Sequence, residues 1–495
     1  MEDSEFVQKY GPVKVRFIQP PPHHPLFTRP HALNYFHKDH LYRTKGERGS
    51  TKFELFFDLL YVGIVANLAR TATEEASGLS LLRYVLVFCP AWQIWQDLKD
   101  FMNYYYNDDI TQRFYVLWIM TLLVIYTNNA PYVTDSNKGT AMVVVTFIVA
   151  RLSGVAMIFS YTFVIVEHRY QMRYNSLFVV CICGVWLSVI WVSIRVKVAI
   201  AFVCIFLETL AYTWSFHPIF KQLLKVDYST AVNIEHEVER MGAFYIIALG
   251  EFLYGIVANA PAGFGFTHNL ARAIMTLIIA YCFLWFYFNG EGSERAIHAI
   301  RRSIPTAYLW MYSHIPLFAS LLLAADAAGD FTGSDFESTK KHLTSGNPTQ
   351  EEVDEANHNY SLQFFFTGGT CVALLCITLL ALLDKSVDKV KTKKLPKLAR
   401  ILPRIPIAIT ILCLAFAQME TTLLMGLVAL ILVVLSCYES YAMMPANCAS
   451  LGADRKMTAD EAEATADMAG DAVTEEAFAD IEAQLESTPS SRGDI

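Results

Sequence analysis

Several ionisable side chains stand inside long apolar stretches of this sequence, where a charge is costly and therefore informative. Glu54 and Asp58 are four residues apart, so both carboxylates lie on the same face of a helix. Glu251 and Arg151 lie in two further apolar stretches, and His314 lies in a third. A carboxylate placed there can carry a proton or bind a cation, and a histidine can relay protons. We therefore predict a substrate- or ion-binding site formed by Glu54, Asp58, Arg151, Glu251 and His314.

Each of these residues also has a purely structural interpretation. Arg151 lies deep in its stretch and needs an anion, for which Asp58, Glu54 and Glu251 are the candidates. A static arginine–carboxylate pair would then hold helices together without further function. Glu54 could be an interfacial charge, because it stands near the start of its stretch. His314 precedes a helix-distorting proline, so its ring could bond a freed carbonyl group instead of relaying protons.

The elements that must position these residues are membrane-spanning helices. Of the 495 residues, 54% are hydrophobic and only 17% are charged, and the charges gather in the two tails and a few loops. A hydrocarbon core about 30 Å thick needs roughly 20 apolar residues per helix. Lipid offers backbone groups no partners, so spanning chains are helices or closed barrels, and the alternating strands of a barrel are absent here. The sequence predicts an all-α polytopic transmembrane helix bundle of about 10–12 spans. The predicted spans are 53–70, 80–98, 114–131, 140–166, 176–194, 198–217, 241–258, 270–289, 305–326, 361–383, 404–419 and 421–441.

Charge asymmetry sets the predicted orientation, because cytoplasmic loops carry an excess of Lys and Arg. The N-terminal tail holds nine Lys and Arg residues and the loop 385–404 holds eight. The loop 326–360 is acidic and is placed outside, where Arg195 and Lys197 are exceptions to the rule. An even number of spans puts both termini in the cytoplasm. We favour the plasma membrane as the location.

This pattern divides the chain into five parts. The parts are a basic cytoplasmic N-terminal tail (1–52) with only local order, a first transmembrane half (53–217), a cytoplasmic linker (218–240), a second transmembrane half (241–441) and an acidic cytoplasmic C-terminal tail (442–495).

Two groups of charged residues have predicted roles at the cytoplasmic surface. The Lys-rich loop at 385–404 is expected to bind anionic lipid. The seventh span is preceded by His236, Glu239 and Arg240, and we expect their side chains to snorkel towards the cytoplasm.

The two halves contain an internal repeat. Segments 58–67 and 251–259 share an acid, a tyrosine three residues later, and then Gly-Ile-Val-Ala-Asn. The spans that follow match more faintly, with 92–95 (WQIW) similar to 283–286 (FLWF) and 116–120 (VLWIM) similar to 308–311 (YLWM). An offset of six spans returns each repeat in the same orientation, so we predict two parallel six-span repeats. Such pseudo-symmetry is common in secondary transporters, whose sites lie at the interface between the repeats.

Signals of soluble enzymes and of nucleic-acid binding are missing from the sequence. It contains no Walker-type loop, Rossmann glycine pattern, GxSxG or HExxH motif. The pair Cys181 and Cys183 lacks the second pair or nearby histidine that zinc requires, so we predict no metal site and no cofactor. The formal net charge of −8 averages a basic front and an acidic tail, and it gives no support for nucleic acid as a partner. The expected partners are the lipid bilayer and an unidentified small solute or ion.

Four blocks of the sequence resemble the bacterial low temperature requirement A (LtrA) family. Residues 53–60 (FELFFDLL) are similar to the LELFFDL opening of that family. Residues 239–251 resemble its second block, ER-x-G followed by LGE, and 285–289 and 314–317 resemble two further blocks, the last of them H-x-P. The order of the blocks is preserved over roughly residues 50–330.

The resemblance implies a multi-span membrane protein associated with growth in the cold, and it implies no particular biochemical activity. Asn289 stands where the family commonly has Asp, and Phe252 stands where Ser is common, so any specificity carried by those positions does not transfer. The long tails and the acidic loop indicate a eukaryotic, fungal member.

Three functions are compatible with these observations. The preferred hypothesis is an ion- or proton-coupled secondary transporter, in which Asp58 or Glu251 titrates in a cavity between the halves. The second is a membrane-embedded enzyme acting on a lipid or prenyl substrate, with His314 and Glu251 as acid and base. The third is a non-catalytic sensor or scaffold that works through its acidic C-terminal tail and Lys-rich loop. The duplicated acids favour the transporter, so enzymatic activity is not the preferred interpretation.

Overall fold

The computed structural model describes residues 14–38, 40–44, 49–223, 226–258, 261–290, 296–333, 350–386 and 393–446. The chain divides into a large unit, Met1–Lys389 with Leu395–Met443, and a small unit, Val390–Lys394 with Met444–Ile495. In the small unit, Lys393 and Pro445 form an isolated antiparallel bridge. Most of the predicted acidic tail at 442–495, with the Lys-rich positions 387–392, lies outside the described residues. All named helices and strands belong to the large unit.

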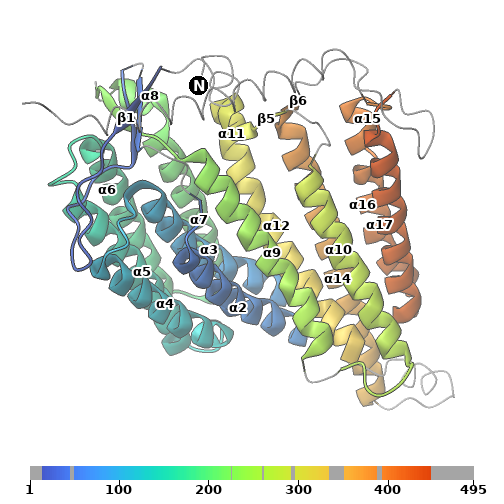
Figure 1. The fold of residues 1–495 in the computed structure, drawn as a ribbon. Helices are drawn as coiled ribbons and strands as arrows, with labels where there is room; N and C mark the ends of the chain where they lie inside the picture. The colour runs from blue at the N-terminus through green and yellow to red at the C-terminus, as the bar shows by residue number, and fades with distance from the viewer. Residues whose placement is uncertain are drawn as a thin grey trace, which may run out of the picture. The chain divides into compact units, whose positions relative to one another are not determined.

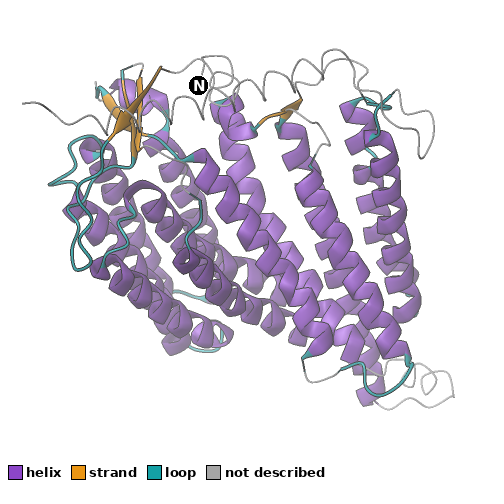
Figure 2. Ribbon diagram, in the orientation of Figure 1, coloured by secondary structure: helices purple, strands orange, loops and turns teal. Residues whose placement is uncertain are grey.

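The large unit is a bundle of long helices, as the sequence predicts (Figures 1 and 2). Ten of the described helices are long and apolar enough to cross a membrane. The first half contains α2 (Lys52–Glu75), α3 (Gly78–Tyr105), α4 (Ile110–Asn129), α5 (Asn137–Tyr161), α6 (Arg169–Leu187) and α7 (Ile194–Phe216). The second half contains α9 (Ile234–Val257), α10 (His268–Asn289), α12 (Ile304–Gly333), α14 (Gln350–Leu383), α16 (Arg404–Leu414) and α17 (Thr421–Met443).

Local sequence fixes where the helices begin. Thr51 caps α2 in a reciprocal capping box, because its side chain accepts the backbone N–H of Glu54 and the Glu54 carboxylate accepts the N–H of Thr51. Asp109 and Asn233 cap α4 and α9 without a reciprocal bond, each with a side-chain oxygen that accepts an N–H group of the first turn. Large hydrophobic side chains such as Leu59 and Phe206 remain exposed on the bundle, as is expected for helices that face lipid.

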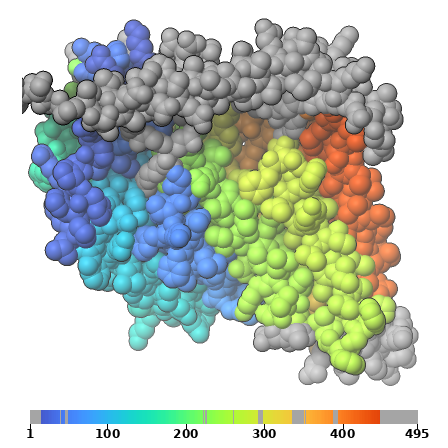
Figure 3. Space-filling model, in the orientation of Figure 1, coloured from blue at the N-terminus to red at the C-terminus, as the bar shows by residue number. Residues whose placement is uncertain are grey.

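Helices of the two halves have similar neighbours. In the first half, α2 packs against α3 and α4, α4 against α5, α5 against α3 and α6, and α6 against α7. In the second half, α9 packs against α10 and α12, α12 against α14, α14 against α10 and α16, and α10 against α17. The halves meet where α2 contacts α9 and α12. The space-filling view shows the outer surfaces of α2, α9, α10 and α17 along one face of the bundle (Figure 3).

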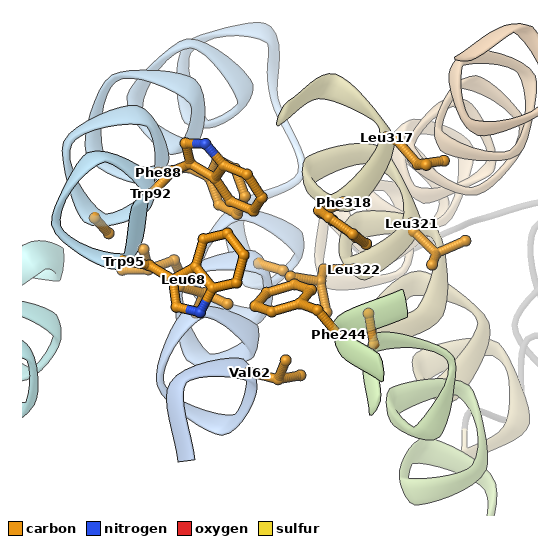
Figure 4. Close-up of a cluster of buried hydrophobic side chains, with 14 of the residues drawn as sticks. Val62, Leu68, Phe88, Trp92, Trp95, Phe244, Leu317, Phe318, Leu321 and Leu322 are labelled. Atoms are coloured by element: carbon orange, nitrogen blue, oxygen red, sulfur yellow. The ribbon is translucent and has the colours of Figure 1, made fainter. Parts of the chain in front are cut away.

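An aromatic core fills the contact between the halves (Figure 4). Trp92 and Trp95 of α3 lie with ring centroids 4.7 Å apart, and Trp95 meets Phe244 of α9 edge-on at 4.8 Å. Phe244 in turn lies 4.5 Å from Phe318 of α12. Each of these four side chains is at most 2% exposed. Burial of rings of this size, with tilted and edge-on geometry, makes this contact a strong one.

The segments at one end of the bundle form a small sheet and several short helices, and we call this the basic end. It carries β1 (Lys14–Ile18), β2 (Asn34–His37), β3 (His40–Thr44) and β4 (Tyr228–Thr230), with α8 (Pro218–Leu223), α11 (Ala299–Arg302) and α15 (Lys397–Ile401) (Figure 1). The strand order is β1-β3-β2-β4, and β2 pairs antiparallel with β4, with Tyr35 opposite Thr230. The N-terminal segment is therefore bound to the connection between the halves, which is more order than the sequence predicts for residues 1–52.

Two predicted boundaries need correction. Helix α9 begins at Ile234 rather than near residue 241, because the Asn233 cap and the partners of its first turns allow charged residues inside the bundle. Helix α12 continues to Gly333 and α14 begins at Gln350. Asp326 and Asp330 therefore lie in a helix, whereas the sequence predicts an outward loop from 326 to 360. We call the end of the bundle where α12 ends and where α3 and α7 begin the far end.

Candidate functional site

A buried ion pair joins the two halves of the molecule. The Nε atom of Arg240 donates to Asp58 Oδ2 at 2.9 Å, and Nη2 donates to Asp58 Oδ1 at 2.6 Å. The indole Nε1 of Trp95 also donates to Asp58 Oδ1, at 2.9 Å. All three side chains are completely buried. A two-point arginine–carboxylate contact of this kind fixes both the distance and the orientation of α2 and α9.

The second acid of α2 is bound by the same helix of the other half. Glu54 Oε1 lies 2.9 Å from His236 Nε2 and 3.2 Å from Arg240 Nη1. The Glu54 carboxylate also closes the capping box with Thr51. Glu54 is fully buried, so it is not an interfacial charge. The spacing of four residues therefore does place both α2 acids on one face, and that face meets α9.

The neighbours of His236 determine which of its ring nitrogens carries the proton. Asn103 Oδ1 accepts the backbone N–H of Asn233 at 2.9 Å, so the amide group of Asn103 points its Nδ2 towards the ring. That Nδ2 lies 3.2 Å from His236 Nδ1, which must then be the acceptor. Nε2 consequently holds the proton and donates it to Glu54. The geometry fits a neutral imidazole.

A second ion pair extends the site towards α3. Lys99 Nζ contacts Glu237 Oε1 and lies 3.3 Å from Asp100 Oδ1. Lys99 is completely buried, and the side chain of Asp100, at the edge, is 14% exposed. The other carboxylate oxygen of Glu237, Oε2, is buried without a hydrogen-bond partner. A buried acceptor left unsatisfied is costly, so this atom is where a proton or a cation would be stabilised.

We define the interface cluster by its charged and polar members, which come from α2, α3 and α9. They are Glu54, Asp58, Lys99, Asp100, Asn103, His236, Glu237 and Arg240. Among these described residues, three buried carboxylates and the partly exposed Asp100 lie with two permanent cations and a neutral histidine. A buried carboxylate oxygen without a hydrogen-bond partner is costly. A proton or a cation at Glu237 Oε2 would therefore lower the free energy of the cluster.

Arg151 does not belong to this cluster, and the expected partners were wrong. Its guanidinium pairs with Asp97 of α3, and Gln93 Nε2 donates to the same carboxylate at 3.3 Å. Helix α5 packs against α3, whereas α2 and α9 meet each other, so Arg151 reaches the acid on its own neighbour. Glu208 of α7 lies nearby and accepts the indole N–H of Trp186 at 2.9 Å.

Glu251 lies in a different part of α9 from the interface cluster. Asp58 comes six residues after the start of α2, whereas Glu251 comes seventeen residues after the start of α9. At 1.5 Å per residue the two acids differ in depth by roughly 16 Å, so they do not occupy matching places in the two halves. Glu251 instead interacts electrostatically with Asp326 and Arg70 near the far end, where Thr73 donates to Asp326.

His314 lies in the aromatic core. Its Nδ1 is 2.8 Å from the carbonyl oxygen of Trp310, and its Nε2 is 3.1 Å from the hydroxyl of Tyr287. The ring is completely buried and packs edge-on against Trp310, with centroids 4.3 Å apart. Its contacts are therefore different from those of Glu251, with which the enzyme hypothesis would pair it.

The sequence analysis missed six members of the cluster, which stand close to predicted span ends. His236 and Arg240 were assigned to the cytoplasmic boundary. The other four were not singled out, and they are Lys99, Asp100, Asn103 and Glu237. Two signals could have identified them. Asn233 followed by acids in the next four residues is typical of a helix start, which moves α9 earlier by two turns. The two acids of α2 also require cations, and Arg240 stands in the similar ER-x-G block.

Among the residues that the structure describes, no group of three or more His, Cys, Asp or Glu side chains is arranged to hold a metal ion. A family model described as "Bacterial low temperature requirement A protein (LtrA)" matches residues 50–437. The match covers α2, α3 and α9, which supply the interface cluster. No curated protein and no solved structure matches the chain.

Proposed function

This chain is an integral membrane protein of the low temperature requirement A (LtrA) family, and we propose that it is a secondary transporter coupled to protons or another cation. The interface cluster is the proposed coupling site. The observation that carries this proposal is the buried carboxylate oxygen Glu237 Oε2, which lacks a hydrogen-bond partner in a cluster of carboxylates between the halves. Binding of a proton or a cation at this atom would satisfy it.

The position of the cluster supports a coupling role. The pairs Asp58–Arg240, Glu54–His236 and Lys99–Glu237 all run between the first half and the second half. Any movement that separates the halves must break these contacts, and the strength of the contacts depends on the charge of their members. A proton on Glu237 would remove its attraction for Lys99, so the charge state of the cluster would determine how firmly the halves adhere.

We also propose that the two halves are parallel repeats. Support comes from the similar neighbours of their helices, in which α2 to α5 correspond to α9, α10, α12 and α14. In secondary transporters with such repeats, the substrate site lies at the repeat interface. The short sequence match between 58–67 and 251–259 is not part of this support, because the two acids lie at different depths.

The finer assignments extend this proposal. Both termini are proposed to be cytoplasmic, in the plasma membrane of a fungal cell, since the basic end carries most of the Lys and Arg residues that the positive-inside rule assigns to that side. The loop 385–404 is proposed to bind anionic lipid there. A role in growth at low temperature is proposed on the family resemblance alone, and the transported solute is an unidentified small molecule or ion.

The test is ion flux into proteoliposomes that contain purified protein, with proton, sodium and potassium gradients applied separately. Wild type is compared with Glu237→Gln and Asp58→Asn in the cluster and with Glu251→Gln near the far end. Glu439→Gln is the matched control, because Glu439 is a buried acid paired with Arg404 at 2.6 Å outside the cluster. We expect gradient-driven flux that both cluster variants abolish and the control retains.

Two results would overturn the proposal. Flux that persists in well-folded Glu237→Gln and Asp58→Asn would make the cluster a static lock between helices. Absence of flux above empty liposomes for all three ions would exclude ion coupling of the proposed kind. In the first of these two cases, loss of flux in Glu251→Gln would transfer the coupling site to the far end.

A further inference from the structure

A hydrophobic cavity opens among the helices of the first half, at the far end. It has a volume of about 190 Å³ and lies between α3, α4, α5, α6 and α7. Its inner wall is formed by buried side chains that include Phe147, Val143, Trp186 and Ala201. At its mouth, Leu79 is 73% exposed and faces the surroundings of the bundle. The cavity therefore joins a buried apolar interior to the surface that lipid covers.

The polar atoms of the aromatic rings in this wall are already bonded elsewhere. The Tyr126 hydroxyl donates to the carbonyl oxygen of Val87 at 2.8 Å, and Trp186 Nε1 donates to Glu208 at 2.9 Å. An occupant of the inner cavity consequently meets apolar atoms and aromatic faces. A hydrocarbon chain satisfies that environment, whereas a polar solute would lose hydrogen bonds to water without replacement.

Positive charge gathers at the mouth of the cavity. Lys197 and Arg83 both line it, together with a single carboxylate, Glu75, which is 2.9 Å from Arg83. Lys197 Nζ is bonded to neutral oxygens, those of Asn137 at 3.1 Å and Thr140 at 2.7 Å, so these contacts leave its charge uncompensated. Arg195, in the same first turn of α7, is exposed. Arg195 and Lys197 are the two residues that the sequence analysis gives as exceptions to the positive-inside rule.

We propose that this cavity binds an anionic phospholipid from the leaflet at the far end. One acyl chain enters the cavity along the wall that Phe147 and Trp186 form together, and the phosphate group of the lipid meets Lys197 and Arg83. The apolar cavity suits the acyl chain of the lipid, and the net positive charge at its mouth suits the phosphate group. This site is separate from the interface cluster and from Lys397 and Arg400 of α15 at the basic end, and it does not depend on the transport proposal.

The first experiment measures which lipids stay bound. Full-length protein is placed in nanodiscs of equal phosphatidylglycerol and phosphatidylcholine, extracted in mild detergent, and analysed for retained lipid by native mass spectrometry. We expect wild type to retain phosphatidylglycerol preferentially. Lys197→Gln and Arg83→Gln should each lower the ratio of retained phosphatidylglycerol to phosphatidylcholine about fivefold, the value of one cation near an anionic surface. Arg113→Gln is the control, because Arg113 pairs with Asp108 at 2.9 Å at the basic end.

The second experiment locates the acyl chain. Phosphatidylglycerol with brominated chains should quench the fluorescence of Trp186, measured as the difference between wild type and Trp186→Phe. Ala201→Phe, which fills the cavity, should remove that quenching and leave the fold intact by thermal melting. Equal retention of the two lipids by wild type, or an unchanged ratio in both charge variants, would overturn the proposal. Quenching that survives Ala201→Phe would overturn the placement of the chain.

Discussion

Arg240 on α9 donates hydrogen bonds to both carboxylate oxygens of Asp58 on α2, at 2.9 and 2.6 Å, and both side chains are excluded from solvent. The pair connects the N-terminal parts of α2 and α9. Removal of Arg240 would leave the Asp58 carboxylate buried without its counter-ion, and removal of Asp58 would leave Arg240 with Glu54 as its remaining carboxylate partner. Removal of both partners would leave a gap that apolar side chains can fill.

We therefore predict strong coupling between these two residues in a double-mutant cycle. Asp58→Leu and Arg240→Met should each lower the free energy of unfolding by about 3–5 kcal/mol. The double variant still removes the arginine from Glu54, and its loss should nevertheless be clearly smaller than the sum of the two single losses. The measurement is thermal or denaturant unfolding of the purified protein in one detergent. The same cycle on Arg113 and Asp108, an exposed pair, should show coupling below about 1 kcal/mol. Additive losses for Asp58 and Arg240 would contradict the prediction.

Close contact between α12 and α14 gives a second prediction. A Cβ atom placed on Gly369 would lie 2.6 Å from the carbonyl oxygen of Ser320 and 2.9 Å from Ala324 Cβ. Gly369→Ala should therefore push the two helices apart and cost about 1–3 kcal/mol of unfolding free energy. The adjacent Gly368 is the control, because its Cβ would meet only Leu412 Cδ1 at 3.9 Å. Gly368→Ala should be neutral or slightly stabilising, and equal melting temperatures for both variants would refute this account.

The sequence was sufficient to predict the helical bundle but not the partners inside it. Each span requires roughly 20 apolar residues, so runs such as 361–383 and 421–441 identify helices directly. The ends are harder, because a charge near a helix end is compatible with solvent and with a buried partner. Arg240 was assigned to the boundary for this reason, yet the acids of α2 bring it inside.

The pairing of residues far apart in the sequence depends on which helices touch. Arg151 could have met any of three acids by composition alone, and packing of α5 on α3 gives it Asp97. The match between Asp58 and Glu251 in sequence likewise does not fix their depths, because α9 starts seventeen residues before its acid. A predicted span shows which residues share one face of a helix, but it does not show which other helices pack against that face.

A third prediction concerns the attachment of the N-terminal segment. Asp109 caps α4 by accepting the N–H of Gln112 at 2.9 Å, and its other oxygen accepts the N–H of Thr28 at 3.0 Å. Asp109→Ala removes the cap and leaves the Thr28 N–H buried without a partner, which together should cost about 2 kcal/mol. Chymotrypsin should then cleave faster after Phe27, which is 56% exposed.

Asp108→Asn is the control for this prediction. Asp108 is adjacent to Asp109, but its contact is the exposed pair with Arg113, and its φ of 53° is one that Asn tolerates. Cleavage after Phe27 should remain at the wild-type rate in this variant. If both variants are cleaved at the same rate, the contact between Asp109 and Thr28 does not hold the segment in place.

The last prediction is a loss of stability in acid through His168, which lies between α5 and α6. Burial lowers the pKa of this histidine to about 4, against an ordinary value of 6.5. The unfolded chain therefore binds more protons than the folded one between these values, so the stabilising contribution is complete above pH 6.5 and is lost as the pH falls through about 4. Protonation would disturb the contacts of its ring with the Tyr105 hydroxyl at 2.9 Å and the Asn34 carbonyl at 3.1 Å.

Melting temperatures measured from pH 7 to pH 4 test this role of His168. They should fall less steeply for His168→Gln than for wild type, whereas His23→Gln, at an exposed position, should follow wild type. Parallel curves for wild type and His168→Gln would show that other groups cause the acid loss.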